Sequence, residues 1–229
     1  MSVYENYLEV EKKVQEACKR AGRNREEVTL IAVSKTKPVS MIEELLPHGV
    51  VDFGENKVQE LTAKYEVLPK DLNWHLIGHL QSNKIKKIVG QVDMIQSVDS
   101  FETAQQISRR SGDQGITTDI LLEVNIGEDE NKFGYSADEV ADQLGKISEL
   151  RFVKVKGMMT VAPNFKDSVK NQCVFDNMHK LFIDIGAKKM DNIDMDILSM
   201  GMSGDFKEAI AAGSTLVRIG SAIFGDRQY

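Results

Sequence analysis

The sequence has few cysteines and prolines, and it has no long apolar segment. Only two of its 229 residues are cysteine and four are proline. Cys18 and Cys173 lack the spacing of metal ligands, so we expect reduced packing residues and no structural zinc site. No apolar run approaches the roughly 20 residues that cross a bilayer, and the amino terminus lacks a signal-peptide pattern. The predicted location is therefore cytoplasmic, away from membranes.

An excess of basic residues is also missing. The chain has 29 Lys and Arg against 35 Asp and Glu, a formal net charge of −6. Proteins that bind nucleic acids or anionic membranes usually carry a basic excess, so neither partner is expected. The compact basic cluster of Lys84, Lys86 and Lys87 falls in a predicted helix, where a solvated face explains it. The pattern indicates small partners.

Hydrophobic periodicity predicts an amino-terminal helix followed by alternating strands and helices. The helix has an apolar stripe that Val3 begins, and Gly22 suits a left-handed cap at its end. Short apolar runs then predict strands at 30–34, 50–54, 74–78, 94–98, 119–124, 153–161, 196–200 and 216–219. Helical patterns follow these strands at 39–46, 58–65, 82–89, 136–150, 174–185 and 206–212. A further helix that contains Ala104 and Ile107 is predicted after the fourth strand.

Eight strand and helix units over roughly 200 residues fit a single α/β (β/α)8 TIM barrel with an extra N-terminal helix. An open doubly wound sheet would usually have a glycine-rich first turn, whereas the turn at 35–38 contains no glycine. No linker-like composition divides the chain. We therefore expect residues 1–229 to form one domain.

Lys35 stands where the first predicted strand ends. Four apolar residues lead into Ser34, and Pro38 stops further strand pairing. Catalytic and binding groups of such barrels collect at the carboxyl ends of the strands, where an amine can form a Schiff base with an aldehyde. The alternative interpretation is structural: Lys35 lies at the rim of the core and only extends its amine into water.

Small residues after the last two predicted strands suggest an anion site. In the turn at 199–205, backbone N–H groups and the Ser203 hydroxyl can converge on an anion, although Ser203 can equally be a helix N-cap. Gly220 and Ser221 follow the eighth strand, and phosphate sites in TIM barrels are frequently built from the loops after strands seven and eight. The pattern favours a phosphate site.

Arg218 lies inside the last apolar run, where a guanidinium needs a partner. That partner is either a carboxylate, such as Glu123 or Asp196, or a ligand atom. A Schiff-base lysine, a phosphate site and an inward arginine together match pyridoxal 5′-phosphate (PLP), which has an aldehyde, a phosphate and a ring nitrogen.

Five segments carry a resemblance to a known family: AVSKTKP at 32–38, FGEN at 53–56, WHLIGHLQSNK at 74–84, LSMGMS at 198–203 and AAGSTLVRIGSAIFG at 211–225. In this order they resemble the YggS/PROSC family of pyridoxal phosphate homeostasis proteins, over nearly the whole chain. The resemblance implies one barrel like the N-terminal domain of alanine racemase, with PLP held as an internal aldimine.

The resemblance also implies roles for individual residues. Lys35 would be the aldimine lysine and Arg218 would face the pyridine nitrogen. Ser203, Gly220 and Ser221 would hold the phosphate, and Asn56 would lie beside the ring. Lys132, in the segment 131–134, resembles a family lysine implicated in cofactor handling, and its role stays open.

An arginine at the ring nitrogen donates a hydrogen bond but does not readily supply a proton, which makes the ring a poorer electron sink. The chain ends at Tyr229, which leaves no room for the second, β-rich domain of the related racemases. We therefore expect a monomeric protein that stores, buffers or delivers PLP, with PLP-dependent apoenzymes as possible recipients.

Two enzymatic alternatives stay open. One is a small amino-acid racemase that uses Lys35 with His79 or Lys132 as proton carriers. The other is a Schiff-base aldolase that acts on a sugar phosphate without a cofactor. A metal site is not expected, because His75 and His79 span a strand and its exit rather than one helix face.

Overall fold

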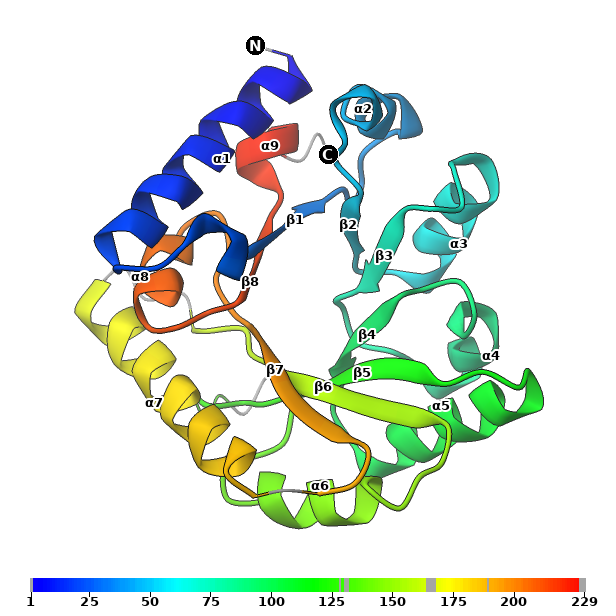
Figure 1. Ribbon diagram of the computed structural model, residues 1–229. Coiled ribbons are helices and arrows are strands. Elements are labelled where there is room, and N and C mark those ends of the chain that lie inside the picture. The colour runs from blue at the N-terminus through cyan, green and yellow to red at the C-terminus, as the bar shows by residue number, and fades with distance from the viewer. Residues whose placement is uncertain (1, 128, 130–131, 164–167, 189, 227–229) are drawn as a thin grey trace.

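The computed structural model describes residues 2–127, 129, 132–163, 168–188 and 190–226. Eight parallel strands close into a barrel in chain order, with β8 paired to β1 (Figure 1). Their bounds are β1 Thr29–Val33, β2 Asp52–Glu55, β3 Asn73–Leu76, β4 Met94–Val98, β5 Thr118–Glu123, β6 Val153–Met159, β7 Ile193–Ser199 and β8 Leu216–Ile219. The predicted (β/α)8 barrel is confirmed.

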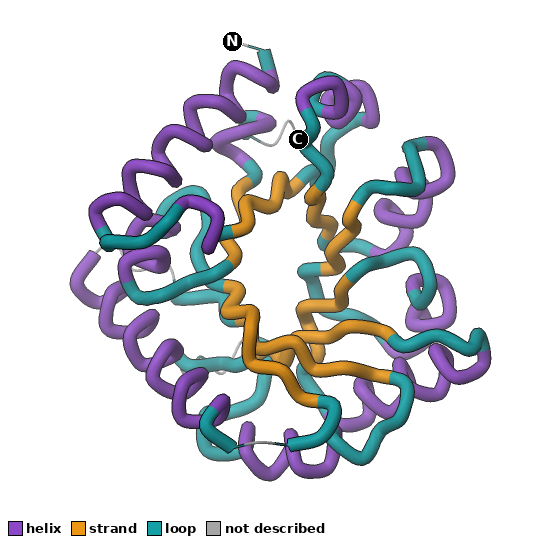
Figure 2. Tube along the Cα trace, in the orientation of Figure 1, coloured by secondary structure: helices purple, strands orange, loops and turns teal. Residues whose placement is uncertain are grey.

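Helices surround the ring of strands, as Figure 2 shows. Their bounds are α1 Val3–Arg20, α2 Val39–Glu43, α3 Val58–Val67, α4 Ile85–Ile88, α5 Phe101–Asp113, α6 Val140–Ile147, α7 Ser168–Gly186, α8 Phe206–Ala211 and α9 Ser221–Phe224. The predicted extra helix is α1, which packs beside α8 and α9 and buries its apolar stripe. Gly22, with φ of 68°, follows its end. No helix in the described ranges is long and apolar enough to span a membrane.

Alternation along the strands separates two apolar layers. In β1, Leu30 and Ala32 belong to the core between strands and helices, whereas Ile31 and Val33 join a small cluster with Leu216 of β8 inside the barrel. Successive strand residues point to opposite faces. The inward series 31, 33 continues to Lys35, which therefore emerges at the carboxyl end of the barrel.

Several helix boundaries differ from the prediction. The helix expected at 39–46 ends at Glu43, and a 3-10 turn follows at Leu46–His48, because Pro47 has no N–H to continue an α-helix. The helix expected at 82–89 divides into a 3-10 turn and α4. The helix expected at 136–150 is shorter, and strands β4 and β8 have the predicted bounds.

The two cysteines differ in environment. Cys18 in α1 is buried, as expected of a packing residue, and both thiols are free. Cys173 in α7 is exposed, so the prediction that it packs in the core is wrong. The helix turns this position toward solvent while its neighbours Phe175 and Met178 face the core.

Candidate functional site

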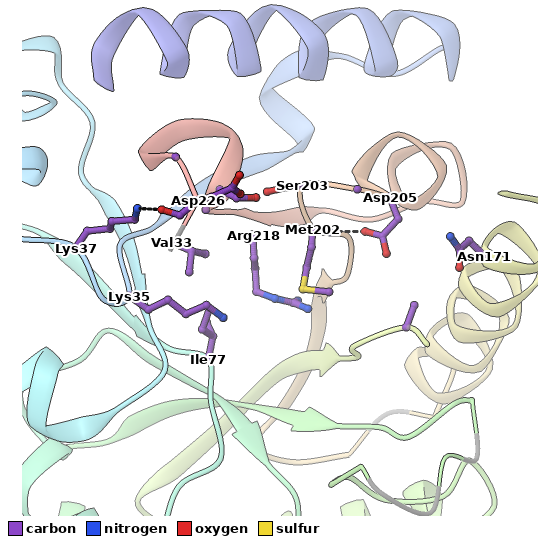
Figure 3. A pocket seen from close by; sticks show the side chains of 15 residues that line it. Val33, Lys35, Lys37, Ile77, Asn171, Met202, Ser203, Asp205, Arg218 and Asp226 are labelled. Carbon is purple, nitrogen blue, oxygen red and sulfur yellow. Dashed lines mark hydrogen bonds between the residues drawn. The ribbon is translucent and has the colours of Figure 1, made fainter. Parts of the chain in front are cut away.

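A cavity of about 680 Å³ lies at the carboxyl ends of β1, β7 and β8. Its lining includes five of the six residues singled out in the sequence, namely Lys35, Ser203, Arg218, Gly220 and Ser221. In Figure 3 the side chains of Lys35 and Arg218 point into the same space. The fold thus brings an amine, a guanidinium and two loop turns to one place, although they lie far apart in the sequence.

Asn56, the sixth residue, lies next to this cavity rather than in its lining. The Nζ of Lys35 donates a hydrogen bond to the Oδ1 of Asn56, at 3.3 Å. Asn56 follows β2 and lines an adjoining groove with His79 and Gln81. It therefore contacts the Lys35 amine directly from the neighbouring strand.

A buried lysine anchors the backbone that carries Lys35. The Nζ of Lys64 in α3 donates to the carbonyl oxygen of Ser34 at 2.8 Å and forms ion pairs with Glu55 at 2.6 Å and Glu60 at 2.8 Å. The N–H of Thr36 donates to the same Glu60 carboxylate at 2.6 Å. Both peptide neighbours of Lys35 are thereby fixed to one ion-pair network.

Burial raises the pKa of the Glu55 carboxyl, against the opposing effect of the Lys64 ammonium. Glu55 also accepts a hydrogen bond from the Ser34 hydroxyl at 2.6 Å. Sequence reasoning missed this network. Its signal was the pair Glu60 and Lys64, spaced four residues apart on one helix face, but nothing in the spacing shows that Glu55 of β2 completes it.

The turn after β7 presents backbone N–H groups to the cavity. Helix α8 begins at Phe206 with Asp205 at its N-cap position, so the alternative interpretation of Ser203 as the N-cap is wrong. The Asp205 carboxylate instead accepts from the N–H of Met202, at 2.6 Å. Gly201 has φ of 95°, and a Cβ there would lie 2.6 Å from the Cβ of Ala209. Only glycine allows this tight turn.

The N–H groups of Ser203, Gly204 and Ser221 donate no hydrogen bond to any acceptor in the described ranges. All three residues line the cavity. Gly220 brings the second turn close to β1, because a Cβ there would lie 3.0 Å from the carbonyl oxygen of Val33. Backbone donors of this kind suit the oxygens of a phosphate.

Arg218 is buried and meets only neutral oxygens. Its guanidinium donates to the Ser199 hydroxyl at 2.5 Å and to the carbonyl oxygen of Thr160 at 2.8 Å. Among the described residues it forms no ion pair with Glu123 or Asp196, the two carboxylates considered from the sequence. Asp196 instead pairs with Lys156, at 3.5 Å.

Burial lowers the pKa of Arg218 to about 10, and the charges of Glu123 and Asp205 act in the opposite direction. A guanidinium with neutral partners keeps most of its charge uncompensated. Arg218 lines the cavity wall, so a ligand atom, the other partner considered from the sequence, stays the hypothesis for its role.

The opposite side of the barrel mouth holds titratable groups. Burial, and next the charge of Asp99, raise the pKa of Glu123 to about 7. Glu123 and Lys132 line a small cavity of about 170 Å³, and the Nζ of Lys132 donates to the carbonyl oxygen of Val161 at 3.1 Å. Asn131, in the same motif, lies outside the described residues.

His79 belongs to this side as well. Its Nδ1 lies 2.8 Å from a carboxylate oxygen of Asp99, and its ring stacks on Phe133 with centroids 3.8 Å apart. Within the described ranges, no three His, Cys, Asp or Glu side chains are grouped to hold a metal ion. The two histidines considered from the sequence have different environments. His75 lies in β3 and contacts Gln96 of β4, whereas His79 follows β3 and contacts Asp99.

Comparisons with known proteins bear on the family and the fold of this chain. Residues 9–228 match the model of the alanine racemase N-terminal domain. A pyridoxal phosphate homeostasis protein from Aquifex aeolicus is 39% identical over 230 residues, which cover 100% of both chains. A solved structure of PipY from Synechococcus elongatus with PLP bound is 36% identical, with a TM-score of 0.79 over 87% of this chain and 93% of that chain.

Alanine racemase from Clostridium difficile shares the fold, with a TM-score of 0.70 and 15% identity over 96% of this chain and 57% of that chain. The agreement in fold therefore covers little more than half of that longer chain. The full-length similarity to curated relatives and the matched domain together show that this chain belongs to the pyridoxal phosphate homeostasis protein family, with the alanine racemase N-terminal domain fold.

Proposed function

We propose that this chain binds PLP, holds it as a reversible Schiff base on Lys35, and stores, buffers or delivers it inside the cell. The observation that carries the proposal is the convergence of Lys35, Arg218 and the free N–H groups of two turns on one cavity. Relatives of the same length are named for PLP homeostasis, and PipY has been solved with PLP bound.

Each functional group of PLP has a matching residue. The Lys35 amine would hold the aldehyde carbon as an imine, which forms with loss of water and returns the free amine and aldehyde on hydrolysis. The N–H groups of the turns, with the hydroxyls of Ser203 and Ser221, would donate hydrogen bonds to the phosphate oxygens. The Arg218 guanidinium would donate to the ring nitrogen.

A carrier is favoured over a catalyst because Arg218 does not readily supply a proton to the ring. The racemase alternative needs proton carriers near the substrate. The two candidates, His79 and Lys132, both lie close enough to Glu123 to affect its pKa, so this alternative also has residues at the barrel mouth. Solvent deuterium at the α-carbon of a bound amino acid separates the two functions, since a carrier does not catalyse this exchange at a useful rate.

The test is the absorption spectrum of the purified protein with PLP, before and after borohydride, followed by mapping of the reduced adduct. The visible band is expected to disappear on reduction and the adduct to map to Lys35. In Lys35→Ala the band should be absent, with weaker, phosphate-driven binding left. Lys37→Ala is the matched control, because the Lys37 amine donates to the carbonyl oxygen of Asp226 at 2.7 Å and should not form the adduct.

An unchanged band in Lys35→Ala, or a reduced adduct on another lysine, contradicts the proposed site. A colourless protein that borohydride traps only in the presence of a sugar phosphate would support the aldolase alternative instead. The monomeric state, the cytoplasmic location and delivery to apoenzymes belong to the same proposal. Sedimentation, fractionation and reactivation of a PLP-free enzyme test them separately.

A further inference from the structure

A chain of buried polar side chains crosses the interior of the barrel and ends at Arg218. The guanidinium lies 2.5 Å from the Oγ of Ser199, and that Oγ lies 2.7 Å from the Oε1 of Gln96. The Nε2 of Gln96 lies 3.2 Å from the Nδ1 of His75. All four side chains are buried. They come from β8, β7, β4 and β3, so Gln96 reaches across the barrel to a strand that is not its neighbour.

The structure orients these side chains so that their hydrogen bonds run in one direction. Arginine only donates, so Ser199 accepts from Arg218, and the Ser199 hydroxyl in turn donates to the Oε1 of Gln96. Gln96 therefore turns its carbonyl oxygen toward Ser199 and its amide nitrogen toward His75. The Nδ1 of His75 must then accept, which places the imidazole proton on Nε2. That nitrogen lies 3.6 Å from a carboxylate oxygen of Asp52.

Apolar side chains could fill the same space at lower cost, since each buried polar group needs a partner. Elsewhere in the barrel, the clusters around Ile31 and around Leu121 fill interior space in that way. The polar chain is instead hydrogen-bonded at each link from the Nδ1 of His75 to Arg218, while the Nε2 of His75 has no hydrogen-bond partner among the described residues. Its arrangement fixes one edge of the guanidinium through Ser199, while the Thr160 carbonyl oxygen fixes a second N–H.

We propose that Gln96 and Ser199 are positioning residues, which hold the Arg218 guanidinium in one orientation so that its remaining N–H groups face the cavity. The effect on a ligand rests on the proposed PLP site, because Arg218 would meet the ring nitrogen there. The orientation of Arg218 itself does not depend on that function.

The first test uses the protein without ligand. In ¹⁵N NMR spectra, His75 is expected as the Nε2-protonated tautomer, and the Arg218 guanidinium is expected to give separate, slowly rotating N–H signals. Ser199→Ala and Gln96→Met should average the Arg218 signals, and Gln96→Met should also release the tautomer preference of His75. An Nδ1-protonated His75, or averaged Arg218 signals in the unmodified chain, overturns the proposal whether or not PLP binds.

The second test compares two buried serines. Ser199→Ala is expected to weaken PLP binding about fivefold to tenfold and to shift the absorption maximum of bound PLP, because Arg218 loses one of the two contacts that fix its orientation, an effect of about 1 kcal/mol. Ser111 of α5 is equally buried, and its hydroxyl forms a hydrogen bond with the hydroxyl of Thr118 in β5, at 2.7 Å between the oxygens. Neither residue lines the cavity. Ser111→Ala should leave affinity and spectrum unchanged.

Equal affinity and spectrum in both serine variants would leave Ser199 with a structural role only and would refute the positioning role. If no variant and no unmodified protein binds PLP, the proposed function fails, while the ligand-free NMR result still decides the orientation of Arg218. The two proposals therefore fail in distinguishable ways.

Discussion

Two buried cations flank the Lys35 site, and the protein compensates them differently. Lys64, behind the first strand, is 4% exposed and meets two carboxylates, Glu55 and Glu60. Arg218, at the cavity wall, is also 4% exposed but meets only a hydroxyl and a carbonyl oxygen. The first charge is satisfied inside the fold and holds the backbone. The second meets no carboxylate among the described residues, and under the proposed function its partner is the ring nitrogen of PLP.

The largest expected effect is on stability when Lys64 is removed. Lys64→Met leaves the fully buried Glu55 without its counter-charge, and breaking a buried ion pair from one side costs about 3–5 kcal/mol. Denaturant unfolding measures this loss. The double variant Glu55→Gln with Lys64→Met should recover much of it, since no charge is then stranded. A loss below about 1 kcal/mol in the single variant would contradict the assigned role of Lys64.

The second prediction concerns Glu123, whose charge opposes the lowering of the Arg218 pKa by burial more strongly than the charge of Asp205 does. Because the pKa of Glu123 is raised to about 7 in the folded chain, the native state binds more protons than the unfolded chain from about pH 4.5 to 7. The free energy of unfolding should therefore fall as the pH rises through this range. Above about pH 7 the destabilisation by the ionised Glu123 has reached its full value.

Glu123→Gln removes this titration. At pH 8 the variant is expected to be more stable than the unmodified chain, by up to about 3 kcal/mol, and at pH 4 the two should be similar. Thermal or denaturant unfolding at several pH values measures the difference. The same pH dependence in both proteins would show that Glu123 is not the titrating group.

Arg218 itself should be less important for stability than Lys64. Arg218→Met is expected to cost less than about 2 kcal/mol, because it strands only neutral oxygens and removes a costly buried charge. PLP affinity should fall at least about tenfold, since the ring nitrogen loses its donor. Parallel unfolding and binding measurements separate the effects. A loss of stability as large as in Lys64→Met would remove the contrast between the two cations.

The smallest effect is expected at Glu60, the partly exposed partner of Lys64. In Glu60→Gln the amide oxygen still accepts from the Thr36 N–H, and Glu55 still neutralises Lys64, so the cost should stay below about 1 kcal/mol. Urea unfolding beside Lys64→Met provides the comparison. A cost equal to that of Lys64→Met would place the main compensation of Lys64 at the surface rather than at Glu55.

Much of the fold could be predicted because its strands are buried on both faces. Short segments such as 94–98 and 216–219 are mostly apolar and predict strands, and both strands have the predicted bounds. The boundaries of short helices were harder to predict, because local turns at Pro47 and Lys84 end or divide them without changing the hydrophobic pattern. The exposure of Cys173 depended on the packing of α7, which its spacing alone does not determine.

The sequence by itself determined the barrel, the place of Lys35 at a strand end, and the two small-residue turns, because periodicity and local chemistry fix these features. Only the tertiary structure decided which partners the buried cations have. The Glu55–Lys64 pair and the chain from Arg218 to His75 join side chains from different strands and helices. Such contacts depend on barrel closure and side-chain direction, which no short stretch of sequence contains.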